Sequence, residues 1–572
     1  MPRRCFTLVL HSHLPWVLHH GRWPHGVDWL NEAAVETYLP LWRLLSTRAH
    51  DGRSTGITLG LTPVLCEQLA HPDFHREFVT YLETKLAAAR EDRSFLARTG
   101  EAAMAALAER WEAFYRGALE DFLGPHGPNL VARFRRLEER GAIEIITCGA
   151  THGYLPLLSS DAAAAEQIRV AVASHRRHFG RAPRGIWLPE CAYRPAGPWP
   201  SEAIRRLGGF NRPEHERTGI ESLLSPHGIE YFFVDTHLLS GGRPLGVYAD
   251  RFEALRHFAR PQPAADAPDH RPYRPYRVGA SISVSCFGRD PVTALQVWSG
   301  EHGYPGHGDY LDFHKKRFPG GHRYWRVTHP KADLAHKEIY RPEAAEARAP
   351  QHAAHFVGLL SRTLHQQPES AMACAMFDTE LFGHWWFEGP SFLGAVLDLA
   401  AAHGEFESTT PTAYLAQEPP SQAIALPEGS WGDGGGHQVW LNDATRWTWE
   451  RVHDAESRFE RLVHHAVTRP RDPLLDRLVA QAGRELLVLQ SSDWQFLITT
   501  LSALDYAELR VTEHSAAFER LAALAERRAE SGALSESDAA FLADCEQRDS
   551  LFADYDWRGH AAARSSHAVT TG

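Results

Sequence analysis

The sequence lacks the features of a disulfide-stabilised or membrane-embedded protein. Its seven cysteines are scattered, odd in number and contain no Cys-x-x-Cys pair, which argues against a disulfide framework or a zinc knuckle and favours a reducing compartment. No apolar run approaches the length of a membrane span. The run near the N-terminus stops at His11, too early for the core of a signal peptide. We therefore expect a cytoplasmic protein with no membrane partner.

An excess of basic residues is also missing. The chain has 60 Lys and Arg against 71 Asp and Glu, a formal net charge of −11, which argues against a broad nucleic-acid-binding surface. The glycine-rich segment at 429–440, GSWGDGGGHQVW, is not a phosphate loop, because no Gly-Lys-Ser/Thr follows it. Two residue types are abundant instead, with 17 Trp and 35 His. Most Trp side chains belong to protein cores, but their flat faces also suit stacking against sugar rings.

Seven short apolar runs along the 572 residues each lead into polar residues. The runs are 5–10, 56–61, 143–150, 185–189, 231–235, 282–287 and 372–377. Such runs, separated by helical stretches, are typical of buried parallel strands in an α/β protein. Polar residues gathered after strand ends are typical of the active-site face of a barrel. We predict an incomplete (β/α)7 TIM-like barrel, with a doubly wound open sheet as the alternative.

The pattern divides the chain into a barrel and a helical C-terminal part. Residues 1–410 would form the catalytic barrel, interrupted by a helical insertion at 65–140 and by a loop at 241–277, of which residues 255–277 are rich in Pro, His and Arg. This loop suits a lid, and a plain surface insertion is an equal alternative. Residues 411–555 would form a helix-bundle domain that adds aromatic residues to the cleft. Residues 556–572 would be a disordered tail.

Two carboxylates follow strand-like runs and could form a glycosidase pair. Glu190 lies in WLPECAY and Asp378 in MFDTELFGHWW. Glycoside cleavage needs one carboxyl group to attack the anomeric carbon and another to protonate the leaving oxygen. Capping of the next helix is the alternative for Glu190, and Glu380 competes with Asp378.

The histidines admit a second chemistry. His11 and His13 form a His-x-His pair after the first run, and three more histidines follow other runs: His152, His237 and His384. A metal-dependent amidohydrolase or deacetylase would use such residues as ligands. A sugar site would use them as neutral hydrogen-bond partners. The spacing leaves both open.

Longer motifs resemble a known family. The segments are HSHLP (11–15), TCGATHGYLP (147–156), WLPECAY (187–193), FDTELFGHWWFEGP (377–390), SWGDGGGHQVWLND (430–443) and SSDWQFL (491–497). In this order they are similar to glycoside hydrolase family 57, and within it to the 1,4-α-glucan branching enzymes. The resemblance spans roughly residues 5–510.

The resemblance implies a retaining enzyme without metal or cofactor, with an α-glucan such as amylose or a glycogen-like polysaccharide as its partner. Glu190 would be the nucleophile and Asp378 the general acid/base. The implied sugar-binding residues are His11, His13, Trp29, His152, Trp298, Trp431, Trp440 and Asp493. The expected monomer would cleave α-1,4 bonds and form α-1,6 branches. The alternatives are an α-glucan hydrolase or 4-α-glucanotransferase of the same family, and a glucan-binding protein without activity.

The sequence departs from the family pattern at residues 241–277. Branching enzymes of the family have a shorter loop here, with a Tyr thought to shield the intermediate from water. In this chain Tyr248, Tyr273 and Tyr276 compete for that role, so the balance between transfer and hydrolysis depends on this loop.

Overall fold

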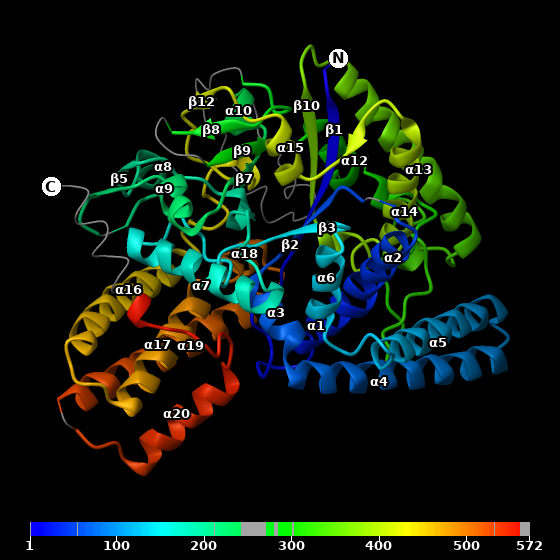
Figure 1. Ribbon diagram of the computed structural model, residues 1–572. Coiled ribbons are helices and arrows are strands. Elements are labelled where there is room, and N and C mark those ends of the chain that lie inside the picture. The colour runs from blue at the N-terminus through cyan, green and yellow to red at the C-terminus, as the bar shows by residue number, and fades with distance from the viewer. Residues whose placement is uncertain are drawn as a thin grey trace.

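Two mainly parallel sheets lie at the centre of the molecule (Figure 1). The computed structural model describes residues 2–53, 55–210, 212–241, 270–279, 284–299, 303–530 and 532–560. The first sheet has the order β10 (Ala371–Asp378), β1 (Arg4–Ser12), β2 (Ile57–Leu61), β3 (Ile143–Ile146), and β11 (Glu407–Ser408) also pairs with β1. The second has the order β12 (Ala423–Ile424), β8 (Tyr276–Val278), β9 (Ser285–Gly288), β7 (Tyr231–Val234), β4 (Gly185–Ile186). All seven predicted runs contain a strand.

Two parallel bridges connect these sheets. Thr147 pairs with Ile186, and Arg289 pairs with Cys374. The backbone N–H of Trp187 donates to the Thr147 carbonyl, and that of Asp290 donates to the Cys374 carbonyl, both at 2.8 Å. The long strands β1 and β10 are buried along nearly their whole length, as expected for parallel strands covered on both faces. The predicted α/β class is confirmed, and closure into a seven-stranded barrel stays a prediction.

Helices cover the sheets on several sides. The longer ones are α1 (Val27–Ala33), α2 (Leu39–His50), α7 (Asp161–Phe179), α12 (Pro291–Trp298), α13 (Pro342–His365) and α14 (Gly389–His403). A π-helical turn, η1 (Ala34–Tyr38), joins α1 to α2. Short helices are α8 (Glu202–Arg206), α9 (Ile220–Leu224), α10 (His237–Ser240) and α15 (Pro411–Gln417), and β5 (Gly197–Trp199) pairs antiparallel with β6 (His215–Arg217). Single 3₁₀ turns are η2 (Pro189–Cys191), η3 (Ser225–His227), η4 (Tyr304–Gly306), η5 (Leu334–His336), η6 (Thr379–Leu381) and η7 (Asp433–Gly435).

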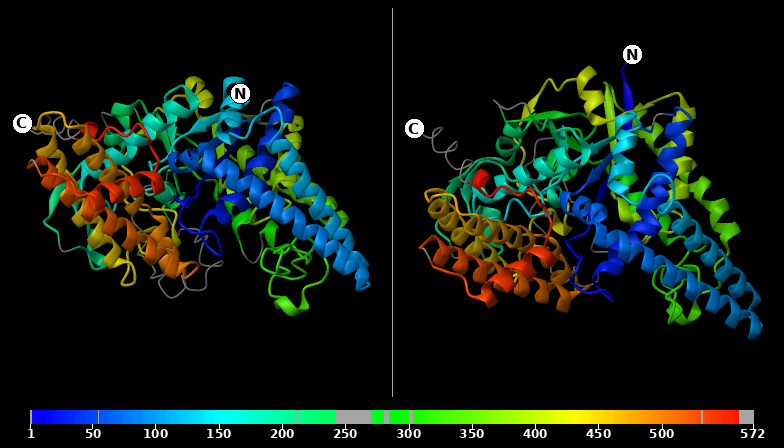
Figure 2. Two further views of the ribbon diagram at one scale, coloured as in Figure 1. Left: turned by 90° about the horizontal axis from the view of Figure 1, so that it is seen from below. Right: turned by 60° about the horizontal axis from the view of Figure 1, so that its bottom comes forward.

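The segment predicted as a helical insertion consists of four helices. They are α3 (Pro63–Ala70), α4 (Pro72–Arg98), α5 (Ala102–Phe122) and α6 (Leu130–Glu139). The antiparallel pair α4 and α5 projects from the body of the molecule (Figures 1 and 2). The two helices bury an apolar face that includes Phe78, Leu82 and Trp111.

The C-terminal part is helical, as predicted, and lies on the other side of the sheets from the α4–α5 pair (Figure 2). Its helices are α16 (Arg446–Val467), α17 (Pro473–Leu489), α18 (Asp493–Thr500), α19 (Leu504–Ala529) and α20 (Glu536–Arg548). The tail predicted from residue 556 is wrong for residues 556–560. Trp557 is only 3 % exposed, and Arg558 forms an ion pair with Asp476, so burial and charge pairing hold this stretch in place. Among the described residues, no helix combines the length and the apolar character needed to cross a bilayer.

Candidate active site

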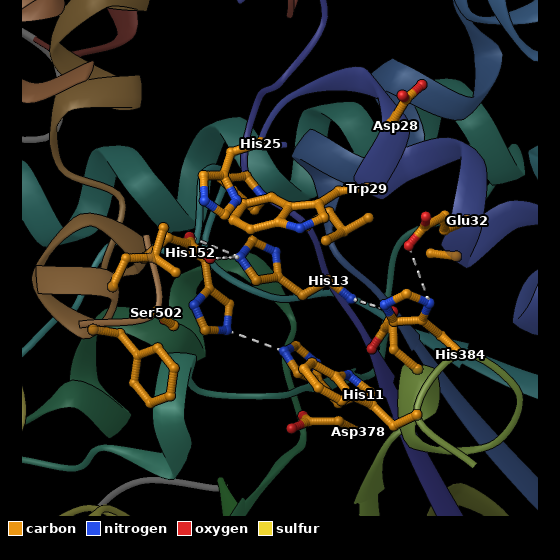
Figure 3. Close-up of a pocket in the computed structure, with 18 of the residues that line it drawn as sticks. His11, His13, His25, Asp28, Trp29, Glu32, His152, Asp378, His384 and Ser502 are labelled. Carbon is orange, nitrogen blue, oxygen red and sulfur yellow. Dashed lines mark hydrogen bonds and ion pairs between the residues drawn. The ribbon is translucent and has the colours of Figure 1, made fainter. Parts of the chain in front are cut away.

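A cavity of about 410 Å³ opens between the carboxyl ends of the strands and the C-terminal helices (Figure 3). Nine residues to which the family resemblance gave a catalytic or sugar-binding role line it: His11, His13, Trp29, His152, Glu190, Trp298, Asp378, Trp431 and Asp493. Some follow strand ends, and the others come from α1, α12, the glycine-rich segment and the start of α18. The parallel arrangement of the strands brings the strand-end residues together, because their carboxyl ends share one face.

Glu190 lies just after β4, in a strained backbone conformation. Its φ is +60° and its ψ is 25°, in the left-handed region that costs a non-glycine residue about 1–3 kcal/mol. The Glu190 carbonyl accepts a hydrogen bond from the backbone N–H of Trp431 at 3.1 Å. The Trp431 indole Nε1–H donates to Glu190 Oε2 at 2.7 Å. Glu190 is therefore fixed by the glycine-rich segment and does not cap a helix.

The surroundings of Glu190 favour its protonated form. Burial raises the pKa of its carboxyl to about 8, and the nearby Asp378 and Asp493 carboxylates add to this rise. The hydrogen bond from Trp431 opposes it, because it stabilises the charged form. A carboxyl group whose pKa lies near neutral pH, in a cavity, is typical of acid/base and nucleophilic sites.

Asp378 and Glu380 differ in their contacts. Asp378 ends β10 and is in register with His11 on β1, and it lines the cavity. Glu380 also lines the cavity, but its Oε1 accepts hydrogen bonds from the Tyr38 hydroxyl and, at 3.1 Å, from the His13 backbone N–H. Burial raises the pKa of Glu380 to about 8. These bonds make Glu380 a support for the strand ends around it.

His11, His13 and His152 form one cluster, in which His11 is hydrogen-bonded to His152 and the His13 ring stacks on that of His152 at 3.9 Å. His11 Nε2 and His152 Nε2 lie 3.0 Å apart, and His152 Nδ1 lies 2.8 Å from the Ser492 hydroxyl. His13 Nε2 lies 2.9 Å from Asp493 Oδ2. Burial lowers the pKa of His11 and of His152 well below the ordinary value, so both imidazoles are neutral. Neutral imidazoles suit sugar hydroxyls as partners.

The same cluster offers ligands for a metal ion. His11, Cys148 and His152 form one possible group, and His13, His152 and Asp493 form another, with ligand atoms within 4.8 Å of one another in each. Each imidazole has at least one partner in the network described above. Among the described residues, the buried His11 Nδ1 has no hydrogen-bond partner.

Of the predicted aromatic residues, some line the wall of the cavity and one is buried in the protein core. Trp431 and Trp298 lie with their rings 6.4 Å apart, and both line the cavity. Trp440 does not line it, so the expected glucan contact of Trp440 is wrong. Its side chain is fully buried, with its ring 4.5 Å from that of Tyr154. A Cβ on Gly432 would lie 2.6 Å from the Trp440 ring, so the glycine-rich segment folds over Trp440 and presents Trp431 instead.

Two of the three predicted lid tyrosines, Tyr273 and Tyr276, do not reach the cavity. The Tyr273 hydroxyl donates to Asp290 Oδ1 at 2.9 Å, and the Tyr276 hydroxyl donates to the Arg271 carbonyl at 3.1 Å. Neither lines the cavity. Tyr248 lies outside the described residues.

Several lining residues escaped the sequence analysis. They include Trp23, which is 70 % exposed, and Phe313, Lys316, Trp385 and Phe496. Trp23 stands in the polar stretch HHGRWPHG, where an exposed Trp could have signalled a ligand contact. His384 was noted among the histidines, but no sugar-binding role was given to it.

Comparisons with known proteins identify the family of this chain. The sequence model of glycosyl hydrolase family 57 matches residues 7–427. The sequence model of the C-terminal region of 1,4-α-glucan branching enzymes matches residues 451–560. The chain belongs to glycosyl hydrolase family 57, as the motifs indicated.

Its relatives include enzymes with different named activities. A 1,4-α-glucan branching enzyme of Thermococcus kodakarensis is 40 % identical over 96 % of this chain and 77 % of its own length. The crystal structure of a branching enzyme of Pyrococcus horikoshii aligns with a TM-score of 0.85 at 38 % identity, covering 97 % of this chain and 96 % of that one. That of an α-amylase of Thermotoga maritima aligns with a TM-score of 0.77 at 28 % identity, covering 98 % and 99 %.

Proposed function

We propose that this chain is a 1,4-α-glucan branching enzyme, which cleaves α-1,4 bonds in a glucan and re-forms them as α-1,6 branches. One observation carries the proposal: Glu190 and Asp378 face a single aromatic-walled cavity in a chain that is 40 % identical to a branching enzyme over nearly its whole length. Family membership favours this chemistry over a metal-dependent deacetylase.

The proposed cycle has two displacements at one carbon atom. Glu190 attacks C1 of the donor sugar while Asp378 protonates the departing oxygen, which gives a covalent glycosyl–enzyme. Asp378 then removes the proton from a 6-hydroxyl of an acceptor chain, which displaces Glu190 and forms the branch. Attack by water instead would give hydrolysis, so exclusion of water decides the product.

The neutral histidines, Asp493 and the Trp walls have supporting roles in this proposal. His11, His13 and His152 bind the sugar at the cleavage point. Asp493 holds His13 through the 2.9 Å contact, and Trp29, Trp298 and Trp431 contact the glucan. The loop at 241–277, with Tyr248 as the remaining lid candidate, governs water access.

The fold belongs to the same proposal. Seven parallel strands, joined across the two sheets by the Thr147–Ile186 and Arg289–Cys374 bridges, support one incomplete (β/α)7 barrel over residues 1–410. Residues 411–555 then form a helical domain that completes the cleft.

We also propose a monomer in the cytoplasm that acts on a glycogen-like glucan. All seven cysteines are unpaired, which agrees with a reducing compartment.

An α-glucan hydrolase is the second candidate, favoured by the likeness to the α-amylase of Thermotoga maritima. Incubation with linear amylose, followed by enzymatic debranching and chain-length profiling, separates the two. We expect new short chains after debranching. Reducing ends without any α-1,6 linkage would identify a hydrolase, and new α-1,4 chain lengths alone would identify a 4-α-glucanotransferase.

Glu190→Gln serves as the control for turnover. It should abolish product formation but leave glucan binding intact, as measured by affinity electrophoresis. A wild-type protein that binds glucan but turns over no α-glucan would instead identify a binding protein.

A further inference from the structure

His384 reaches the cavity from the loop that follows Asp378. Its Nδ1 lies 3.1 Å from Glu36 Oε2. Burial alone would raise the pKa of Glu36, but Arg323 and His384 bring it below the ordinary value, so Glu36 is ionised. A carboxylate only accepts hydrogen bonds, so His384 Nδ1 carries the proton and donates it. No described residue is hydrogen-bonded to the other ring nitrogen, Nε2, and the residue lines the cavity.

The π-helical turn η1 fixes His384 at several points. The Thr37 hydroxyl accepts the His384 backbone N–H at 3.0 Å. Arg323 donates to Glu36 Oε1 at 2.5 Å and to the His384 carbonyl at 3.2 Å. Gly383 has a φ of +132°, and a Cβ there would overlap the Glu36 carbonyl. π-Helical turns occur frequently at functional sites, and this one holds an imidazole in a defined tautomer.

An aromatic surface lies beside this imidazole. The rings of Phe313 and Trp385 are 4.3 Å apart, and both flank the His384 ring at 5.2 and 5.4 Å. Lys316 Nζ lies 3.6 Å from Glu32 Oε1, and both residues line the cavity. Flat aromatic faces combined with a few fixed polar groups are typical of a sugar subsite.

The position of His384 indicates whether this aromatic surface would contact the donor or the acceptor sugar. A general acid/base serves the leaving oxygen first and then the acceptor hydroxyl that replaces it, so the acceptor binds on the Asp378 side. His384 stands in the loop that begins directly after Asp378 at the end of β10. In Figure 3, His384 and Glu32 lie on the opposite side of His13 from His152 and Ser502.

We propose that His384, held by Glu36, binds a hydroxyl of the acceptor glucan through Nε2, with Phe313 and Trp385 as the stacking surface for that sugar. The sugar hydroxyl and Nε2 share this hydrogen bond, and His384 performs no covalent step. Glu36 is a positioning residue, because it acts through His384. The inference rests on the proposed function, and it adds an acceptor subsite to that function.

The test separates donor chemistry from acceptor binding. α-Maltosyl fluoride forms the glycosyl–enzyme without an acceptor, because fluoride leaves without protonation. For His384→Gln we expect fluoride release in water alone to stay within about twofold of the wild type. The maltopentaose concentration that gives half-maximal transfer should rise roughly three- to tenfold, as for the loss of one hydrogen bond. His464→Gln, at an exposed site on α16, should change neither value.

Two results would overturn the inference. One is fluoride release that falls by the same factor as transfer, which would assign His384 to the donor side or to the fold. The other is an unchanged maltopentaose requirement. If the wild type transfers to maltopentaose but makes no α-1,6 linkage, branching is refuted while the acceptor measurement still decides the role of His384.

Glu36→Gln provides the second variant. It should raise the maltopentaose requirement like His384→Gln, and the double variant should be no worse than the single ones, since both changes remove one interaction. If the increases in the maltopentaose requirement of the two single variants added up in the double variant, Glu36 and His384 would not act together. Thermal unfolding midpoints check the fold, and His384→Asn replaces any variant that does not fold.

Discussion

At the scale of single residues, the two carboxylates have roles that can be told apart chemically. In a retaining α-enzyme, azide replaces the missing group on the face from which that group acted. With α-maltosyl fluoride and azide, we expect Glu190→Ala to give the β-glycosyl azide and Asp378→Ala to give the α-glycosyl azide. Without azide, Glu190→Ala should lose at least about a thousandfold in kcat. Product configuration by NMR is the measurement, and exchanged configurations would reverse the assignment.

The Trp431–Glu190 hydrogen bond predicts a shift in pH dependence. The nucleophile must be ionised, burial raises the pKa of Glu190 to about 8, and the Trp431 N–H opposes this rise. Trp431→Phe removes the donor, so the pKa of Glu190 rises further. The acidic limb of the kcat/KM profile should then move to higher pH by about one unit, and activity at pH 6 should fall more than activity at pH 9.

A uniform loss of activity at all pH values would contradict this account of Trp431. It would indicate that the indole acts through stacking alone. Trp298→Phe, which removes an indole whose ring lies 6.4 Å from that of Trp431, is the matched control and should leave the limb in place.

At the scale of elements, the close approach of the η1 turn to the loop after β10 is the most constrained contact around the site. Gly383 has a φ of +132°, with the Glu36 backbone in the space that a Cβ would occupy. We expect Gly383→Ala to lower the thermal unfolding midpoint clearly and to reduce activity, since neither backbone can move without displacing Asp378 or His384.

Gly404→Ala is the control for the glycine itself. Gly404 follows α14 with a φ of +72° and has open space where a Cβ would stand. Only the cost of the left-handed conformation applies there, about 1 kcal/mol. Equal losses in the two variants would show that backbone strain, and not the contact with η1, matters at Gly383.

At the scale of the whole molecule, the C-terminal helices complete the site. Asp493 at the start of α18 is hydrogen-bonded to His13, which directly follows β1, and Ser492 is hydrogen-bonded to His152. Asp493→Asn should lower kcat/KM by roughly ten- to a hundredfold with little loss of stability, because His13 loses a charged partner. Asp443→Asn, at a fully exposed carboxylate, should have no effect. Unchanged activity in Asp493→Asn would mean that the C-terminal region only supports the fold.

The sequence by itself determined the seven strands in the apolar runs, the helical character of the C-terminal part and the family. Apolar runs such as 372–377 leave few alternatives to a buried strand, and motifs such as WLPECAY are local in the chain. Side-chain direction is not local. Trp431 and Trp440 stand in one motif, yet one lines the cavity and the other is buried against Tyr154.

Only the tertiary structure decided which residues meet in the cavity. Trp23, Phe313 and Lys316 carry no motif, and the link between Glu36 and His384 joins segments far apart in the chain. The physical reason is that hydrogen bonds, stacking and desolvation depend on distance in space. A sequence pattern reports period and composition, while the packing of η1 and α18 against the strand ends sets those distances.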